Sequence, residues 1–259
     1  KVVDRRAEVA AIRAALPSLS HTVWLPYLGA AGGRVGRGGD AATVGGADLS
    51  WAELTADSDE PLTFTPLPFD HPLYILYSSG TTGLPKPIVH GHGGILLEHL
   101  KMLALHHDLG PGDRFFWYST TGWMMWNYLA SGPAVGAAVV LFDGDPGHPG
   151  LGALWRLAAE AGVTYFGASA PFLLACRKRG LVPKEEVDLS RLRGVGSTGA
   201  PLPAEGFDWV YAAVSDTAAL QSLSGGTDVC TGFVGGAPLL PVWRGEISGP
   251  CLGAKVQAY

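Results

Sequence analysis

The chain has 259 residues, of which 47% are hydrophobic, which is enough to build one large globular domain or two small ones and argues against disorder. Its 18 Lys and Arg against 23 Asp and Glu give a formal net charge of −5, so the composition excludes the broad basic surface with which proteins bind nucleic acids or anionic membranes. The cysteines at 176, 230 and 251 are too far apart for a zinc motif or a disulfide framework, and the longest apolar run, 134–142, is too short to cross a bilayer. We therefore predict a cytoplasmic protein with free thiols and with no nucleic-acid or membrane partner.

Residues 1–72 are predicted to form a lead-in segment ahead of the main domain. Apolar residues at helical spacing predict a helix over 5–16, and Ser50 followed by Glu53 has the pattern of a capping box that starts a short helix. The remaining lead-in elements are a buried strand at 21–29, a Gly-rich surface loop at 29–48 and an extended Pro-rich connector at 61–72.

From residue 73 onward, strand-like segments alternate with helix-like segments. This alternation is typical of βαβ units, so we predict an α/β fold in which parallel sheets are flanked by helices. Ligands of such folds bind beyond the carboxyl ends of strands, which makes the loops after residues 77, 119, 198 and 224 the candidate binding loops. The expected strands are 73–77, 114–119, 137–142, 163–169, 192–200, 218–225 and 245–250, and the expected helices are 94–108, 123–132, 152–162, 171–180 and 203–214.

A loop with the sequence SSGTTGLPK (78–86) follows the first of these strands. Glycines allow backbone N–H groups to converge on an anion, hydroxyl groups add donors, and Lys86 supplies a positive charge, a combination that suits a polyphosphate. The Walker A pattern is not met, because Gly80 and Gly83 are too close together and Pro87 follows Lys86 where a hydroxyl residue is needed. A flexible linker is disfavoured because the loop directly follows an apolar strand and contains a single charge.

The longer stretch YSSGTTGLPKPIVHGHGG (77–94) resembles the phosphate-binding signature of the adenylate-forming enzymes, which include acyl-CoA synthetases, peptide-synthetase adenylation domains and luciferases. Two later stretches resemble motifs of that superfamily in the expected order: GSTGAPLP (196–203), whose counterpart packs along adenine, and LSGGTDVC (223–230), whose counterpart ends in Thr and an acid. The resemblance implies that residues 1–259 are a fragment of the large N-terminal AMP-binding domain, with the nucleotide- and acyl-binding core at 73–259.

The resemblance also implies roles for individual residues. Lys86, Thr227 and Asp228 would be catalytic, with Thr227 at the α-phosphate and Asp228 as the residue that helps to place Mg²⁺. Asp228 stands where Glu is commoner, so its shorter side chain would reach the metal through water. The residues expected to bind ATP are Ser78, Ser79, Gly80, Thr81, Thr82, Gly83, Lys86, Gly199, Ala200, Pro201 and Thr227.

Within the superfamily, the stretches 117–132 and 222–233 most resemble the acyl-CoA synthetases that activate acetoacetate. Acetate-activating relatives have a Trp that floors the acyl pocket at the position matched by Gly225, so glycine there would make room for a longer acid. Gly226, Trp123 and Met124 are expected to line the same pocket. The alternative for Trp123 and Met124 is that both are ordinary core residues, and we weigh the two interpretations equally.

The implied reaction converts a short keto acid, ATP and coenzyme A, through an acyl-adenylate, into the CoA thioester, AMP and diphosphate. The ribose-binding Asp, the hinge and the small C-terminal domain with its lysine would lie beyond this chain, so the fragment alone is expected to have little or no turnover. Three alternatives stay open: a synthetase for another short- or medium-chain acid, an adenylation domain that loads a carrier-protein thiol, and a non-catalytic nucleotide-binding module of the same fold.

Five histidines are clustered in the sequence after the phosphate loop. They suggest a zinc site only if their side chains converge. We disfavour this interpretation because two of them belong to the phosphate-loop segment, and the other three fall on different faces of the predicted helix. The five are His90, His92, His99, His106 and His107.

Overall fold

The structure is a computed structural model that describes residues 5–24, 47–56, 60–78 and 83–257. The chain forms two compact units, Lys1–Thr65 and Pro66–Tyr259, whereas the sequence-based boundary was placed after residue 72. Residues 69–72 belong with the second unit because the Phe69 ring covers Gly93 and the backbone N–H of His92 donates to the carbonyl of His71 at 3.0 Å.

The described part of the first unit is a small α/β element. It consists of α1 (Arg6–Ala15), β1 (His21–Trp24), β2 (Ala47–Ser50) and α2 (Trp51–Leu54), with β1 and β2 parallel. The predicted capping box is confirmed, since Glu53 N donates to Ser50 Oγ at 3.1 Å and Ser50 N donates to Glu53 Oε2 at 2.8 Å.

Two lead-in predictions need correction. The strand expected at 21–29 is a strand over 21–24, but Val23 is 44% exposed, so this part is not buried. The Gly-rich loop predicted to reach residue 48 ends earlier, because residues 47–50 pair with β1. The rest of both segments, 25–46, lies outside the described residues.

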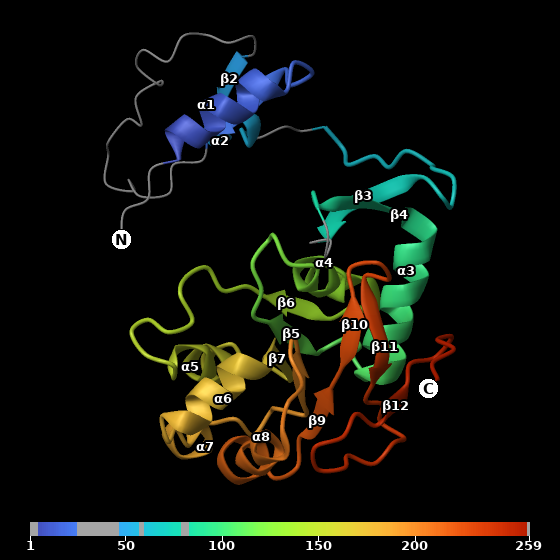
Figure 1. Ribbon diagram of the computed structural model, residues 1–259. Helices are drawn as coiled ribbons and strands as arrows, with labels where there is room; N and C mark the ends of the chain where they lie inside the picture. Colours follow the sequence, from blue (N-terminus) through green and yellow to red (C-terminus); the bar gives the residue numbers. More distant parts are fainter. Residues whose placement is uncertain (1–4, 25–46, 57–59, 79–82, 258–259) are drawn as a thin grey trace. The chain divides into compact units, whose positions relative to one another are not determined.

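The second unit is built around a five-stranded sheet (Figure 1). The strands of the whole second unit, in all its sheets, are β3 (Pro72–Ser78), β4 (Lys86–Gly91), β5 (Arg114–Trp117), β6 (Ala138–Val140), β7 (Tyr165–Ser169), β8 (Gly194–Thr198), β9 (Ala219–Ser222), β10 (Ser224–Gly226), β11 (Thr231–Gly235) and β12 (Gly249–Pro250). Its helices are α3 (His92–Leu100), the π-helix η1 (Lys101–His106), α4 (Met125–Ala130), the 3-10 helix η2 (Gly132–Val135), α5 (Ala153–Glu160), α6 (Ala170–Lys178), α7 (Pro183–Glu186), α8 (Ala204–Trp209) and the π-helix η3 (Val210–Val214).

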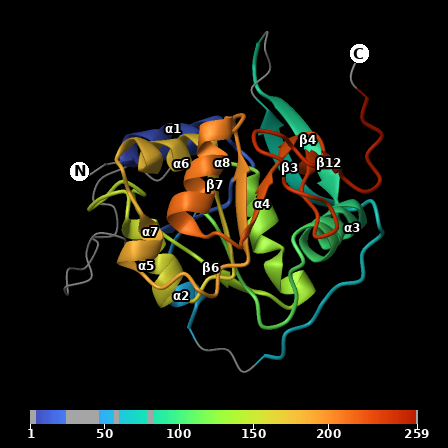
Figure 2. The same cartoon turned by 90° about the horizontal axis from the view of Figure 1, so that it is seen from below.

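The large sheet has the strand order β6-β5-β7-β8-β9, and all four pairings are parallel. This confirms the predicted parallel βαβ architecture. Successive residues of a strand point to opposite faces, so Phe116 and Phe166 pack with Trp155 of α5, while Phe115 and Trp117 pack in a second core with α4 and η1. Helices therefore cover both faces, α5, α6 and α8 on one and α4 with η1 on the other (Figures 1 and 2).

Two smaller antiparallel sheets complete the second unit. The strands β3 and β4 form a hairpin, so the prediction that 73–77 joins a parallel sheet is wrong. The strands β10, β11 and β12 form the other sheet, which we call the ribbon (residues 224–250).

The ribbon departs most from the predictions. The single strand expected at 218–225 divides at Leu223, because β9 ends in the parallel sheet and the chain then enters the ribbon. The strand expected at 245–250 is reduced to Gly249–Pro250. The sequence analysis did not predict β11 or α7.

All three cysteines are free, as predicted, and all three are buried. Burial raises the pKa of each thiol, Cys176, Cys230 and Cys251, to about 11. Among the helices described in the structure, none combines the length and hydropathy needed to span a bilayer.

Candidate functional site

A cavity of about 490 Å³ opens at the carboxyl ends of β5, β8 and β9. Three loops that the sequence analysis singled out, those after 119, 198 and 224, contribute to its lining, as expected for ligand sites in parallel sheets. The lining residues are Trp123, Met124, Met125, Thr198, Gly199, Ala200, Pro201, Ser222, Leu223, Ser224, Gly225, Gly226, Thr227, Thr231 and Ile247.

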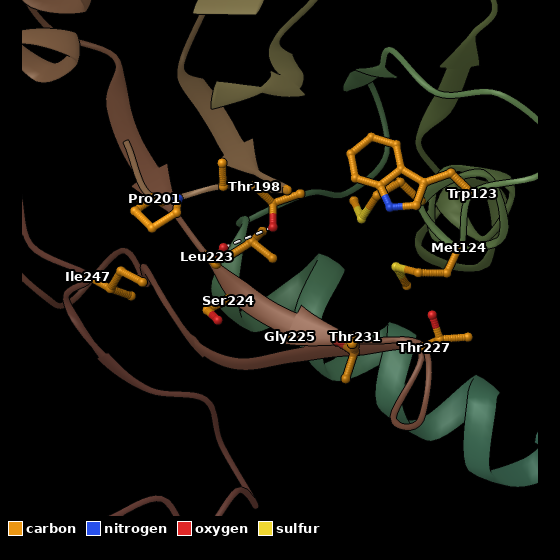
Figure 3. A pocket seen from close by; sticks show the side chains of 15 residues that line it. Trp123, Met124, Thr198, Pro201, Leu223, Ser224, Gly225, Thr227, Thr231 and Ile247 are labelled. Carbon is orange, nitrogen blue, oxygen red and sulfur yellow. Dashed lines mark hydrogen bonds between the residues drawn. The ribbon is translucent and has the colours of Figure 1, made fainter. Parts of the chain in front are cut away.

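The cavity has two ends that differ in their side chains (Figure 3). Trp123 and Met124 lie at one end, beside Thr227, while Pro201 and Ile247 lie at the other. Trp123 and Met124 precede α4 and are only partly buried. Both contact the second core and also line the cavity, so the two interpretations made from the sequence each describe part of their surroundings.

The adenine-type segment 199–201 leaves β8 through a left-handed turn. Gly199 has a φ of +84°, and a Cβ at this position would lie 3.6 Å from the Trp123 indole, so the ring approaches the backbone closely. Thr198 Oγ1 donates to the carbonyl of Leu223 at 2.9 Å, a buried bond that joins this turn to the start of the ribbon (Figure 3).

Gly225 and Gly226 both line the cavity, but their surroundings differ. A Cβ built on Gly225 would lie 1.8 Å from the carbonyl oxygen of Thr231, at the bulge where β10 meets β11. A Cβ on Gly226 would meet nothing within 4 Å. The reason given from the sequence for glycine at 225 therefore needs correction: in this backbone a side chain there would run into β11 rather than fill the acyl pocket.

The phosphate-loop residues that the structure describes lie on the β3–β4 hairpin. Ser78 ends β3 and pairs in register with Lys86 at the start of β4. Lys86 and Gly83 are exposed, and with Ser78 they lie outside the lining of the cavity. The predicted phosphate ligands Ser79, Gly80, Thr81 and Thr82 lie outside the described residues.

The turn Thr227–Cys230 connects β10 to β11 and contains the predicted Thr–acid pair. Thr227 lines the cavity, whereas Asp228 is exposed on the turn and is absent from the lining. The carbonyl of Thr227 accepts from Cys230 N at 3.2 Å and contacts His90 Nε2 of β4 at 2.8 Å. This last contact brings the phosphate-loop hairpin next to the Thr–acid turn.

The clustered histidines bind protein groups individually. Within the described part of the chain, no set of three or more His, Cys, Asp or Glu side chains is arranged to hold a metal ion. His99 contacts the carbonyl of Cys230 at 2.9 Å, His106 that of Gly236 at 2.8 Å, and His107 Nδ1 contacts Gln221 Oε1 at 2.5 Å. Burial lowers the pKa of His107 to about 4 and also lowers the pKa of His99.

The sequence analysis missed several lining residues. Ser224 belongs to the quoted motif 223–230 and could have been found there, since a hydroxyl beside two glycines is a common ligand-loop feature. Thr231 falls within the quoted stretch 222–233 but was not singled out there. Ile247 follows no motif and lies in a stretch without regular structure between β11 and β12. Its position in the cavity depends on the path of that stretch, which no local pattern indicates.

Comparisons with known proteins identify the family to which the chain belongs. Residues 29–256 match the family described as AMP-binding enzyme. The chain is 48% identical over 250 residues to acetoacetyl-coenzyme A synthetase of Rhizobium meliloti (strain 1021), covering 96% of this chain and 37% of that protein. It is 42% identical over 214 residues to malonamoyl-CoA synthetase vrtB of Penicillium aethiopicum, covering 77% of this chain and 30% of that protein. The solved acetoacetyl-CoA synthetase from Streptomyces lividans superposes with a TM-score of 0.86 at 49% identity, over 98% of this chain and 38% of that chain.

Proposed function

Since the chain belongs to the AMP-binding enzyme family, we propose that the full-length protein activates acetoacetate with ATP and coenzyme A to give acetoacetyl-CoA, AMP and diphosphate. The chain spans 37% of the length of the Rhizobium meliloti relative, so the activity is proposed for the whole protein and not for these residues alone. A C-terminal domain of the same protein is part of the proposal, and the free buried thiols fit a reducing compartment such as the cytoplasm.

One observation carries the proposal: a single cavity is lined by residues 199–201, expected at the adenine, by Thr227, and by Trp123 and Met124, expected at the acyl group. Its volume of about 490 Å³ lies within the range of small-molecule sites. A nucleotide at the Pro201 end and an acyl group at the Trp123 end would meet near Thr227, where the reacting phosphate belongs.

In the first half-reaction the substrate carboxylate attacks the α-phosphorus of ATP and diphosphate leaves. The carboxylate is already ionised near neutral pH, so this step needs no general base. The protein contributes position and charge: Thr227 for the α-phosphate, and Ser78, Gly83 and Lys86 for the outer phosphates. In the second half-reaction the CoA thiolate attacks the acyl carbon of the acyl-adenylate. The bond from that carbon to the bridging oxygen breaks, and AMP leaves carrying this oxygen.

The residues present fit a Mg²⁺ ion that travels with the nucleotide. Mg²⁺ in such sites is held by one or two carboxylates together with substrate phosphates and water. Asp228 offers one exposed carboxylate next to Thr227, which matches this donor set. The metal would neutralise phosphate charge during the transfer.

The names of the two kinds of relative limit the range of carboxylic acids that we propose as substrate. Acetoacetyl and malonamoyl groups both have a carbonyl group two bonds from the thioester carbon, and they differ in a terminal methyl against a terminal amino group of similar size. We therefore propose a pocket for a four-heavy-atom chain with a carbonyl at the third carbon. Apolar Trp123 and Met124 favour the methyl group, and so acetoacetate.

The test is acid-dependent exchange of labelled diphosphate into ATP by the full-length protein. Acetoacetate, malonamate, acetate and butyrate are compared at equal concentration. The largest kcat/KM is expected with acetoacetate. A preference for another acid would retain the mechanism and overturn the substrate, and no exchange with any acid would favour a nucleotide-binding module without activity.

Lys86 provides a second test. Replacing it with Ala should remove a charged hydrogen bond to phosphate, worth about 1.5–3 kcal/mol. The kcat/KM for ATP in the exchange reaction should fall by roughly 10- to 100-fold, since each 1.4 kcal/mol is a factor of ten. An unchanged value would remove Lys86 from the site.

A further inference from the structure

Three histidines contact backbone carbonyls at successive points along the ribbon. His90 of β4 contacts the carbonyl of Thr227, His99 of α3 that of Cys230, and His106 of η1 that of Gly236. The N···O distances are 2.8, 2.9 and 2.8 Å. In Figure 1, α3 runs alongside β10 and β11, and the three rings therefore join the ribbon to one side of the unit.

The partners fix the direction of these bonds. A carbonyl oxygen only accepts, so the ring nitrogen that faces it must bear the proton. His99 then has its proton on Nε2, and its Nδ1 contacts the Ser131 hydroxyl at 2.7 Å, which can donate to it. A neutral His99 thus satisfies both ring nitrogens inside a site where the side chain is 1% exposed.

Two of the three bonds hold the ends of one turn. Thr227 and Cys230 are the first and last residues of the turn that contains the Thr–acid pair, and their carbonyls take the bonds from His90 and His99. Cys230 has a φ of +53°, a left-handed conformation that is costly for a residue with a side chain. The turn therefore needs external contacts to hold its geometry, and the two imidazoles provide them.

We propose that His90 and His99 are positioning residues that fix the turn Thr227–Cys230 against the phosphate-loop hairpin. His90 lies four residues after Lys86 on the same strand, so its bond to the carbonyl of Thr227 sets the spacing between the Lys86 side and the Thr227 side of the nucleotide site. Neither ring touches the reactants in this role. The expected change in the KM for Mg·ATP rests on the proposed function. The expected loosening of the turn rests on the geometry alone.

The test compares His90→Met with His90→Gln in the full-length protein. The two side chains are of similar size, but only Gln retains an N–H donor near the position of Nε2. His90→Met should raise the KM for Mg·ATP in diphosphate exchange by roughly three- to tenfold, the size expected for one hydrogen bond, with the KM for CoA in the complete reaction unchanged. His90→Gln should restore most of the loss.

The matched control is His92→Met, two residues further along. The His92 ring is partly buried, and its Nδ1 contacts the carbonyl of His71 at 2.8 Å rather than a carbonyl of the turn. The His92→Met variant should leave the KM for Mg·ATP unchanged. An equal rise in both Met variants, or no rescue by Gln, would overturn the positioning role of His90.

A second readout does not depend on activity. The Cys230 amide donates to the carbonyl of Thr227 at 3.2 Å within the turn. Hydrogen exchange of this amide should be faster in His90→Met than in wild type and His90→Gln, and unchanged in His92→Met. If wild type shows no diphosphate exchange with any acid, the proposed function fails while this comparison still decides the positioning role. Equal rates of hydrogen exchange at the Cys230 amide in all four proteins would exclude that role.

Discussion

The parallel sheet and the ribbon of the second unit are held in place in different ways. In the parallel sheet, large side chains fill two cores, and Phe116, Phe166 and Val195 are at most 1% exposed. The ribbon contains short strands, and residues 224 and 225 at its start are exposed. Its attachment to α3 and η1 includes ring N–H groups bonded to its backbone carbonyls.

The difference indicates how stability and function are divided. Burial of apolar area is non-directional and makes the parallel sheet a stable base. Hydrogen bonds are directional, so they suit a segment that, under the proposed function, presents Thr227 and Asp228 at a fixed position. Changes in the sheet should therefore act mainly on stability, and changes in the ribbon mainly on the site.

The largest effect should come from the core of the sheet. Phe166 is fully buried and stacks on Trp155 with ring centroids 4.2 Å apart. Phe166→Ala should cost about 3–5 kcal/mol of stability because it leaves a cavity. The measurement is the thermal unfolding midpoint, with Leu239→Ala as control, since Leu239 lies in the ribbon and is 95% exposed. Equal midpoints for the two variants would contradict the division between sheet and ribbon.

The next effect is a loss of stability in acid that originates at the edge between the two regions. His107 is buried against Tyr165 and Gln221, and its Nε2 has no hydrogen-bond partner within the described residues. Burial lowers its pKa from 6.5 to about 4, so the unfolded chain binds the proton more readily than the folded chain between these values. The stabilisation is therefore complete above pH 6.5 and is lost as the pH falls to about 4, a loss of up to about 3 kcal/mol.

The check is the unfolding midpoint of wild type and His107→Gln at pH 7.5 and pH 4.5. The variant should be less stable than wild type at the higher pH, because it loses the ring contacts, but its midpoint should fall less on acidification. The lowered pKa of His99 contributes a further loss of stability in acid, and this contribution is the same in both proteins. A drop of the same size in both would assign the acid sensitivity to groups other than His107.

The smallest of the three effects separates two adjacent glycines of the ribbon. Gly225→Ala must displace the β11 backbone, because its Cβ would overlap the Thr231 carbonyl, and should cost about 1–3 kcal/mol. Gly226→Ala has open space for its Cβ and should leave the midpoint within about 0.5 kcal/mol of wild type.

Substrate preference also distinguishes Gly225 from Gly226. Because Gly226 lines the cavity, a larger side chain there, as in Gly226→Leu, should lower kcat/KM for acetoacetate more than for acetate. If Gly225→Ala changed this ratio and Gly226→Leu did not, Gly225 would be the residue that makes room for the longer acid, as the sequence analysis expected.

The sequence predicted the sheet well and the ribbon poorly, for a physical reason. Strands such as β5 and β7 are continuous apolar runs between helices, a local pattern that burial on both faces imposes. The strand β11 has no such pattern, and its pairing with β10 and β12 depends on contacts with distant residues.

The candidate site divides in the same way. The motifs identified Thr227 and residues 199–201, because glycine, hydroxyl and charge spacing is local. They could not identify Ile247, the orientation of Gly225, or the bond from His90 to a carbonyl 137 residues away. Each of these depends on where the ribbon lies and not on neighbouring sequence.

The buried cysteines have a practical consequence for the assay. A disulfide reagent that detects free thiols could follow the consumption of coenzyme A, provided that the enzyme adds little background. With pKa values of about 11, about one in a thousand of the thiols of Cys176, Cys230 and Cys251 would be ionised at pH 8, and all three are shielded from the reagent. A rapid colour change from the native enzyme alone would therefore originate outside these 259 residues or from a chain that has unfolded.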